Sequence, residues 1–494
     1  MALVRSRENF AQTLGLILIS LGVVYLIGNA SVPLWDRDEP RYAQTSRQML
    51  RSGDWVVPRF LDEVRTAKPI FIYWCQAVVM RMLGDTDLAA RVPSVIGMLG
   101  TVAMVGVVIG RTVGRAVGIW SALILGTSAL AIAAGKMCLT DAVLLLFITA
   151  AQLCFFRVCM ERRLSWGGAV VMGVTIGLAG LTKGPVVLGV MGITLLALGG
   201  MRLVERWSQA APAAVEQPRE IRVSGTSLLK VMAILSITAA ICLPWLILIH
   251  QREPNFLPTI IGHDVVTRVR TGLEGHKGPP GYYLLTVWLT YLPWSFLLPM
   301  TVRYAWRRRD VPVVRFAMAA VLGPWLMFEI VQTKLPHYLL PTFPALAFLT
   351  SHMLIEGGKA LRPAVWMGVG MLAAVAIAYG LVLPRIEALR ISPRVAQVLV
   401  ENGATKPGDV IMIDYKEPSL AFYQGGTIRP QRDNAYLNLT PPEQWPRWIV
   451  LTADIWKNTP AEVRAGLEVI ATVHGWAYAD GGRVVDVMVL RKRD

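Results

Sequence analysis

Charged residues are scarce in this sequence of 494 residues. Only 17% of the residues are Asp, Glu, Lys or Arg, whereas 54% are hydrophobic. Soluble proteins carry about 25% charged residues, so lipid rather than water must surround much of this chain. The composition excludes a disordered chain and argues against an ordinary soluble enzyme.

Cysteine and acidic residues are also few. The five cysteines show no CxxC spacing and lie in or beside apolar segments, so we interpret them as free buried thiols. The 33 acidic residues face 49 basic ones, which gives a formal net charge of +16. In a soluble protein this excess of basic residues would suggest binding to nucleic acid. In a membrane protein it first indicates which loops lie on the cytoplasmic side. We expect no nucleic-acid partner.

Long apolar runs follow one another along the chain. A membrane-spanning helix needs about 20 such residues, and the sequence predicts about 11 to 13 of these helices. The runs lie near residues 10–29, 93–110, 115–134, 141–159, 167–181, 184–201, 228–249, 281–302, 313–331, 336–354 and 364–383. The first run is too long for a removable signal peptide and reads as a signal anchor.

Basic residues are distributed unevenly between alternate loops. If the N-terminus is cytoplasmic, the arginines of the short loops face the cytoplasm, and the short outer loops carry only Lys136, Lys183 and Lys334. The sequence therefore predicts a multi-pass protein of the bacterial inner membrane. Residues 30–92, residues 250–280 and everything after Pro384 are expected on the periplasmic side.

The chain changes character after about residue 385. Short strand-like runs at 410–415, 448–452 and 484–490 and a helical stretch at 461–470 are separated by turn residues. We therefore predict a transmembrane domain at 1–385, which includes the outer loop 30–92, and a small periplasmic α/β domain at 386–494. The predicted fold class is an all-α polytopic membrane protein with this small domain.

The first outer loop concentrates polar residues. Its segments 39–50 and 69–83 have the apolar faces and basic edges of helices at a membrane interface. Arg47 and Arg51 are interpreted as solvated. Adjacent carboxylates beside a membrane are costly unless they are paired or used, so Asp38 is a functional candidate and Glu39 a weaker one.

Further polar residues occupy the predicted outer ends of several helices. They are Lys136, Asp141, Lys183, His263, Asp264, Arg268, Lys334, His337 and Tyr338. Carboxylates among several cations suit a phosphate-bearing substrate at the membrane surface. The alternative for each cation is a side chain that snorkels from a helix end to the interface.

Several motifs in collinear order resemble the aminoarabinose transferases of lipid A. They are Asp-Glu-Pro-Arg-Tyr-Ala at 38–43, Gly-Asp-Trp at 53–55, Lys-Pro-Ile-x-x-Tyr-Trp at 68–74, Leu-Thr-Asp at 139–141, Leu-Thr-Lys-Gly at 181–184, His-x-x-x-x-Arg at 263–268 and Lys-Leu-Pro-x-Tyr at 334–338. The resemblance implies a membrane glycosyltransferase of the GT-C fold, with protein O-mannosyltransferases as more distant relatives. Such enzymes transfer a sugar from a polyprenyl-phosphate donor to a lipid or protein acceptor.

The resemblance also implies roles for residues. Asp38 would be the essential carboxylate, with Asp141 and Glu39 as further acidic candidates. The donor phosphate would be bound by Lys68, Arg268 and Tyr338, with Arg41, Tyr42 and Tyr73 close by. Additional site candidates are Lys183, His263, Lys334 and His337. In the family a glutamate before the loop lysine is associated, together with the histidine, with a bound metal; here that position is Ala67, so we expect neither a metal nor another cofactor.

The mechanism that follows is a single displacement. Cations would stabilise the departing polyprenyl phosphate, and Asp38 would act as base if the acceptor is a hydroxyl. The partners expected are the lipid-linked sugar, a lipid acceptor such as lipid A, and membrane lipids. A protein acceptor is one alternative. A transporter or flippase is another, although the sequence lacks visible repeats and its polar residues collect on one side; the identity of the sugar stays open.

Overall fold

The structure is a computed structural model that describes residues 7–35, 37–208, 225–267, 278–358 and 361–493. It divides into two compact units. The helical unit comprises Met1–Leu26, Thr66–Ile72 and Pro93–Val375, and the loop-and-sheet unit comprises Ile27–Arg65, Tyr73–Val92 and Ala376–Asp494. Most of the first loop thus groups with the C-terminal segment.

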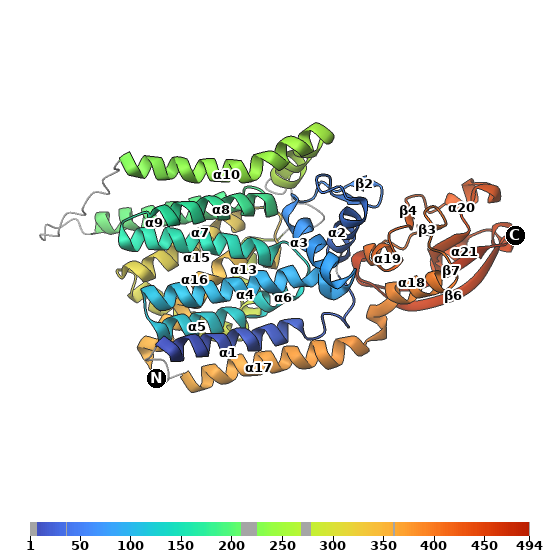
Figure 1. Cartoon of the computed structure of the whole chain (residues 1–494). Helices are drawn as coiled ribbons and strands as arrows, with labels where there is room; N and C mark the ends of the chain where they lie inside the picture. Colours follow the sequence, from blue (N-terminus) through green and yellow to red (C-terminus); the bar gives the residue numbers. More distant parts are fainter. Residues whose placement is uncertain (1–6, 36, 209–224, 268–277, 359–360, 494) are drawn as a thin grey trace, which may run out of the picture. The chain divides into compact units, whose positions relative to one another are not determined.

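The helical unit is built from long apolar helices that run roughly parallel to one another (Figure 1). Its elements, two of which begin or end in the other unit, are α1 (Arg7–Leu26), α4 (Asp87–Thr112), α5 (Arg115–Gly126), α6 (Ala129–Lys136), α7 (Asp141–Glu161), α8 (Trp166–Lys183), α9 (Val186–Ser208), α10 (Gly225–Arg252), α11 (Phe256–Thr259), η2 (Ile260–Thr267), α13 (Tyr282–Thr290), η3 (Trp294–Leu297), α14 (Leu298–Arg307), α15 (Pro312–Ile330), η4 (Pro336–Thr342), α16 (Phe343–Gly357) and α17 (Leu361–Ile377).

Within the described residues, nine helices are long and apolar enough to cross a membrane, or up to 11 if each of two bent pairs is one span. Each predicted run coincides with one of these helices or pairs. The chain is therefore a multi-span membrane protein, and the larger count equals the lower end of the predicted 11 to 13.

The breaks in the two bent helix pairs provide hydrogen-bond partners for each other. The first pair, α5 and α6, bends by 64°, and the second, α13 and the η3–α14 segment, bends by 119°. At the first break the amide of Ala129 donates to the carbonyl of Leu292, at 2.8 Å, which lies in the second break. The Trp294 indole donates to the Thr127 hydroxyl at 3.0 Å. Irregular backbone is tolerated within an apolar bundle because such partners are present.

Helices α8 and α10 pack through small residues. A Cβ atom added at Gly173 or at Gly177 would lie 2.9 Å from the Cβ of Ile237 or of Ile241, respectively. Two glycines one turn apart therefore let the helix backbones approach closely, as is common in membranes.

The loop-and-sheet unit combines the first loop with a mixed sheet. Its elements are α2 (Glu39–Ser52), β1 (Arg59–Phe60), β2 (Glu63–Val64), most of α3 (Phe71–Leu83), η5 (Ala378–Val382), η6 (Leu383–Arg385), η7 (Glu387–Arg390), α18 (Ile391–Glu401), β3 (Val410–Ile413), α19 (Pro418–Tyr423), β4 (Arg429–Gln431), α20 (Tyr436–Leu439), η8 (Pro442–Gln444), β5 (Trp448–Thr452), α21 (Ala453–Asn458), α22 (Ala461–Ala465), β6 (Leu467–Ala477), η9 (Tyr478–Asp480) and β7 (Arg483–Lys492).

The sheet confirms the predicted small α/β domain. Its strand order is β4-β3-β5-β7-β6, with β3 parallel to both of its neighbours and the remaining pairs antiparallel. All five residues of the central strand β5 are buried, which fits a strand covered on both faces.

One predicted element of this domain is wrong in its second half. The helix expected at 461–470 ends at Ala465, and β6 begins at Leu467. Residues Leu467 to Val469 pair with the end of β7, so hydrogen bonding to a distant strand overrides the local helical tendency.

Candidate functional site

Asp38 stands at the start of α2 as its N-cap residue. Its side chain is 50% exposed, and its Oδ1 lies 3.6 Å from an Nη atom of Arg65 and 3.9 Å from one of Arg41. Pro40 lies in the first turn of the helix, where its missing amide proton costs nothing. The helix thus begins by presenting an accessible carboxylate beside two guanidinium groups.

Two tyrosines predicted near the donor phosphate adjoin this carboxylate. The rings of Tyr42 and Tyr73 stack with their centroids 5.6 Å apart. Arg65 Nε donates to the Tyr73 hydroxyl at 3.0 Å, and the Arg65 guanidinium lies 5.1 Å from the centroid of Tyr42. Asp38, Arg41, Tyr42, Arg65 and Tyr73 therefore form one group, which we call the Asp38 cluster. Sequence reasoning missed Arg65, although its position in the same loop was a usable signal.

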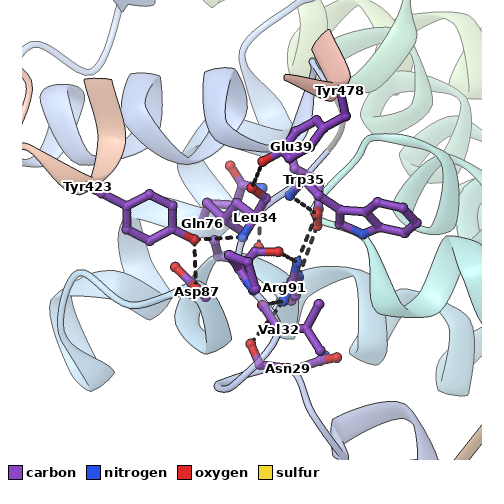
Figure 2. A network of polar contacts seen from close by, with 12 residues as sticks. Asn29, Val32, Leu34, Trp35, Glu39, Gln76, Asp87, Arg91, Tyr423 and Tyr478 are labelled. Carbon is purple, nitrogen blue, oxygen red and sulfur yellow. Dashed lines mark hydrogen bonds and ion pairs between the residues drawn. The ribbon is translucent and has the colours of Figure 1, made fainter. Parts of the chain in front are cut away.

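Glu39 turns away from this group and is fully buried. Its two carboxylate oxygens accept from Arg91 Nε at 3.0 Å and from Arg91 Nη2 at 2.8 Å (Figure 2). The two residues are 0% and 2% exposed. A carboxylate fixed in a buried bidentate pair is built to hold structure, and we no longer regard Glu39 as a candidate for contact with substrate. Arg91 was not identified from the sequence.

A second polar group, in the helical unit, gathers at several helix ends. Asp141 begins α7 and Lys183 ends α8, so each side chain complements its helix dipole. Lys183 Nζ lies 2.6 Å from Asp141 Oδ1 and 5.6 Å from the centroid of the Tyr338 ring. The His337 ring centroid lies 5.1 Å from that of Tyr338, and His337 and Lys68 are both near enough to interact electrostatically with Asp141. The structure brings together these five residues, which we call the Asp141 cluster.

Two further lysines, Lys334 and Lys136, are buried and have specific partners. Lys334 lies 3.0 Å from a carboxylate oxygen of Glu329 and 5.7 Å from the Tyr283 ring centroid. Lys136 is 1% exposed, and its ammonium donates to the carbonyls of Val24 and Tyr25, each at 3.1 Å. Lys136 therefore does not snorkel but satisfies the last carbonyls of α1.

Two candidates of the long second loop are not placed. Arg268 lies outside the described residues, and the side chain of His263, whose backbone belongs to η2, is likewise not described. The residues that the structure does describe contain no group of three or more His, Cys, Asp or Glu side chains that could hold a metal ion. At position 67 the alanine side chain offers no metal ligand.

The expectation that Arg47 is solvated is wrong. Arg47 is 5% exposed, donates to the Phe422 carbonyl at 2.7 Å, and lies 4.4 Å from the Phe422 ring centroid because α19 covers α2. Burial and the charge of Arg51 lower the pKa of Arg47 to about 10, which leaves it protonated at neutral pH. Arg51 is 56% exposed and pairs with Asp85 at 2.7 Å, as a surface residue does.

Residues 13–259 match the family model described as dolichyl-phosphate-mannose-protein mannosyltransferase. The chain is 31% identical to an undecaprenyl phosphate-alpha-4-amino-4-deoxy-L-arabinose arabinosyl transferase 2 of Proteus mirabilis, over 75% of this chain and 66% of that protein. It is also 31% identical to an undecaprenyl phosphate-alpha-4-amino-4-deoxy-L-arabinose arabinosyl transferase of Yersinia enterocolitica, over 68% of this chain and 58% of that protein. The chain thus spans less than two thirds of these curated relatives.

Solved structures show the same fold. A crystal structure of ArnT from Cupriavidus metallidurans bound to undecaprenyl phosphate matches with a TM-score of 0.73 at 18% identity, covering 98% of each chain. An archaeal oligosaccharyltransferase from Archaeoglobus fulgidus matches with a TM-score of 0.53 at 10% identity, covering 90% of this chain and 70% of that one. The predicted GT-C type of architecture is confirmed.

Proposed function

Because the chain belongs to the family described as dolichyl-phosphate-mannose-protein mannosyltransferase, we propose that it is an inverting glycosyltransferase. It moves a sugar from a polyprenyl-phosphate donor to a lipid acceptor, lipid A or a related glycolipid. The names of the curated relatives, which are undecaprenyl-phosphate-aminoarabinose transferases, support this donor class. The observation that carries the proposal is the half-exposed Asp38 carboxylate held beside two arginines.

The donor is bound through its phosphate. When the bond between the anomeric carbon and the phosphate oxygen breaks, negative charge develops on the leaving group, and preorganised cations stabilise it. Lys68 and Tyr338 are assigned to this task together with Arg268. Lys183 adds a cation that already pairs with Asp141. Within the loop-and-sheet unit, the arginines and tyrosines of the Asp38 cluster are further hydrogen-bond donors.

Asp38 is assigned to the acceptor substrate. If the nucleophile is a hydroxyl group, the Asp38 carboxylate accepts its proton as the carbon–oxygen bond forms. If it is a phosphate oxygen of lipid A, the oxygen is already nucleophilic and needs only positioning. Either route is a single displacement and inverts the anomeric carbon. The reaction needs no metal, so a chelator leaves turnover unchanged.

The orientation follows the distribution of arginine. We assign the short arginine-rich loops to the cytoplasm, and the candidate site and the C-terminal domain then belong to the periplasmic side of the bacterial inner membrane. A second candidate keeps the same donor but uses a protein acceptor, because the family description names protein mannosyltransferases.

The test is sugar transfer in nanodiscs from a labelled undecaprenyl-phosphate sugar to lipid A or to a peptide acceptor. Asp38→Asn is expected to abolish transfer, whereas Asp85→Asn, which alters a surface carboxylate paired with Arg51, leaves it unchanged. Lys68→Ala is expected to raise the KM for the donor. Mass spectrometry of membrane glycolipids from cells with and without the gene identifies sugar and acceptor. Full activity of Asp38→Asn contradicts the assigned role, and transfer to peptide alone favours the second candidate.

A further inference from the structure

The connection between α1 and α2 is irregular, and several of its backbone amides and carbonyls are hydrogen-bonded to side chains. Residues 27–35 form turns and extended backbone, with no helix or strand. A buried segment of this kind must find partners for its amides and carbonyls elsewhere. In this connection, side chains distant in the sequence supply them.

Arg91 supplies one set of partners. Its guanidinium donates to the carbonyls of Asn29, Val32 and Pro33 at 2.7 to 3.0 Å, in addition to its two bonds to Glu39 (Figure 2). All five donor positions of an arginine are thus occupied. One buried side chain ties residues 29–33 to the first residue of α2.

Two tyrosines of the C-terminal domain supply the other set. The amide of Leu34 donates to the Tyr423 hydroxyl at 2.6 Å, and the Leu34 carbonyl accepts from the Tyr478 hydroxyl at 2.7 Å (Figure 2). Tyr423 in turn donates to Asp87 Oδ2 at 2.9 Å. Burial, followed by the charge of Asp87, raises the pKa of Tyr423, and burial with the charge of Glu417 raises that of Tyr478, so both hydroxyls keep their protons at neutral pH.

Asp38 lies between two fixed points. On one side, both polar groups of the Leu34 backbone are held by the two tyrosines. On the other side, Glu39 is held by Arg91, and the amide of Trp35 donates to Glu39 Oε2 at 3.2 Å. Anchors on both sides of Asp38 restrict the backbone that carries it, and accurate placement is what a catalytic carboxylate requires.

We propose that Tyr423 and Tyr478 are positioning residues, through which the C-terminal domain holds the loop that presents Asp38 to the substrate. This proposal rests on the proposed function. Neither tyrosine touches the reacting groups. Their hydroxyls bond to the first loop and Asp87, whereas the hydroxyl of Tyr415, in the same domain, bonds to Ser392 at 2.7 Å within that domain.

The experiment compares Tyr423→Phe, Tyr478→Phe and the double variant with Tyr415→Phe in the full-length protein in nanodiscs. Each change removes one hydroxyl and keeps the aromatic ring, so each variant retains the ring packing. We expect the kcat for sugar transfer to fall about tenfold in each single variant and about 10²-fold in the double variant, because small displacements of a catalytic group are costly. The KM for the donor changes less than twofold. Tyr415→Phe keeps the wild-type kcat.

Hydrogen exchange of the backbone amides in residues 31–38 provides a readout that needs no donor. We expect exchange to accelerate at least tenfold in the Tyr423 and Tyr478 variants and to stay unchanged in Tyr415→Phe. Faster exchange with an unchanged kcat overturns the positioning role, as does equal behaviour of all the tyrosine variants. A wild-type protein that transfers no sugar overturns the proposed function instead, and exchange alone then decides whether the tyrosines order the loop.

Discussion

Replacing Glu39 by glutamine removes one charge from the ion pair with Arg91, whose members are 0% and 2% exposed. Arg91 keeps its three bonds to backbone carbonyls but loses the negative charge of the carboxylate that accepts two of its hydrogen bonds. Breaking a buried pair from one side costs about 3–5 kcal/mol, because the remaining charge stays out of water. We expect Glu39→Gln to lower the stability of the loop-and-sheet unit by about this amount.

The neighbouring residue provides the matched comparison. Asp38 is 50% exposed and lies 3.6 and 3.9 Å from its two arginines, and exposed pairs contribute at most about 1 kcal/mol. Asp38→Asn should therefore unfold close to the wild-type temperature while losing activity. Glu39→Gln should unfold clearly earlier, and because it weakens one of the two anchors beside Asp38, it should also lower turnover per folded molecule, although less than Asp38→Asn does.

The measurement is thermal unfolding of the detergent-purified variants, followed by intrinsic fluorescence, with turnover per folded molecule measured in parallel. The prediction keeps Asp38 as the more important carboxylate for activity, as the sequence suggested, and adds a stabilising role for Glu39. If Glu39→Gln unfolds together with Asp38→Asn and the wild type, then the buried pair does not stabilise the fold and this reasoning fails.

Three further outcomes are expected. Arg47→Ala should cost about 2–4 kcal/mol in thermal unfolding, because it removes a buried cation–π contact and bonds to two carbonyls of α19, whereas Arg51→Ala should cost less than about 1 kcal/mol; equal midpoints would contradict this. Asp141→Asn and Lys183→Met should each lower turnover at least tenfold, and a double variant that is no worse than either single one would show that the 2.6 Å pair acts as a unit. A tag after Asp494 should be reachable from the periplasm and one within residues 303–310 should not; the opposite labelling would refute the assigned orientation.

Residues near in the sequence were predicted better than residues brought together by packing. Hydropathy alone located every described membrane-crossing helix, because a helix in lipid must be apolar along about 20 residues whatever its neighbours are. The strand β5 was equally predictable from the sequence, since a central strand that is buried on both faces is a continuous apolar run.

The failures share one physical cause. Arg47 has the spacing of a solvated edge of α2, and nothing local reveals that a segment 374 residues later covers it. Arg91 reads as a basic residue at a helix start, because the carbonyls it binds belong to an irregular connection. The second half of the stretch 461–470 became a strand through its pairing with β7. Burial of a polar residue depends on the partner, and the partner is specified by the whole fold.

The bond from Lys136 to the end of α1 has a consequence for how the chain is assembled. The two carbonyls that Lys136 binds precede it by 112 and 111 residues. During synthesis, α1 leaves the ribosome long before its final partner exists, and its last carbonyls would be costly to leave bare in hydrocarbon. The first helix therefore cannot reach its final packing until α6 has been synthesised. We expect α1 to stay bound to the insertion machinery until then. A nascent chain truncated before residue 136 should still crosslink to that machinery.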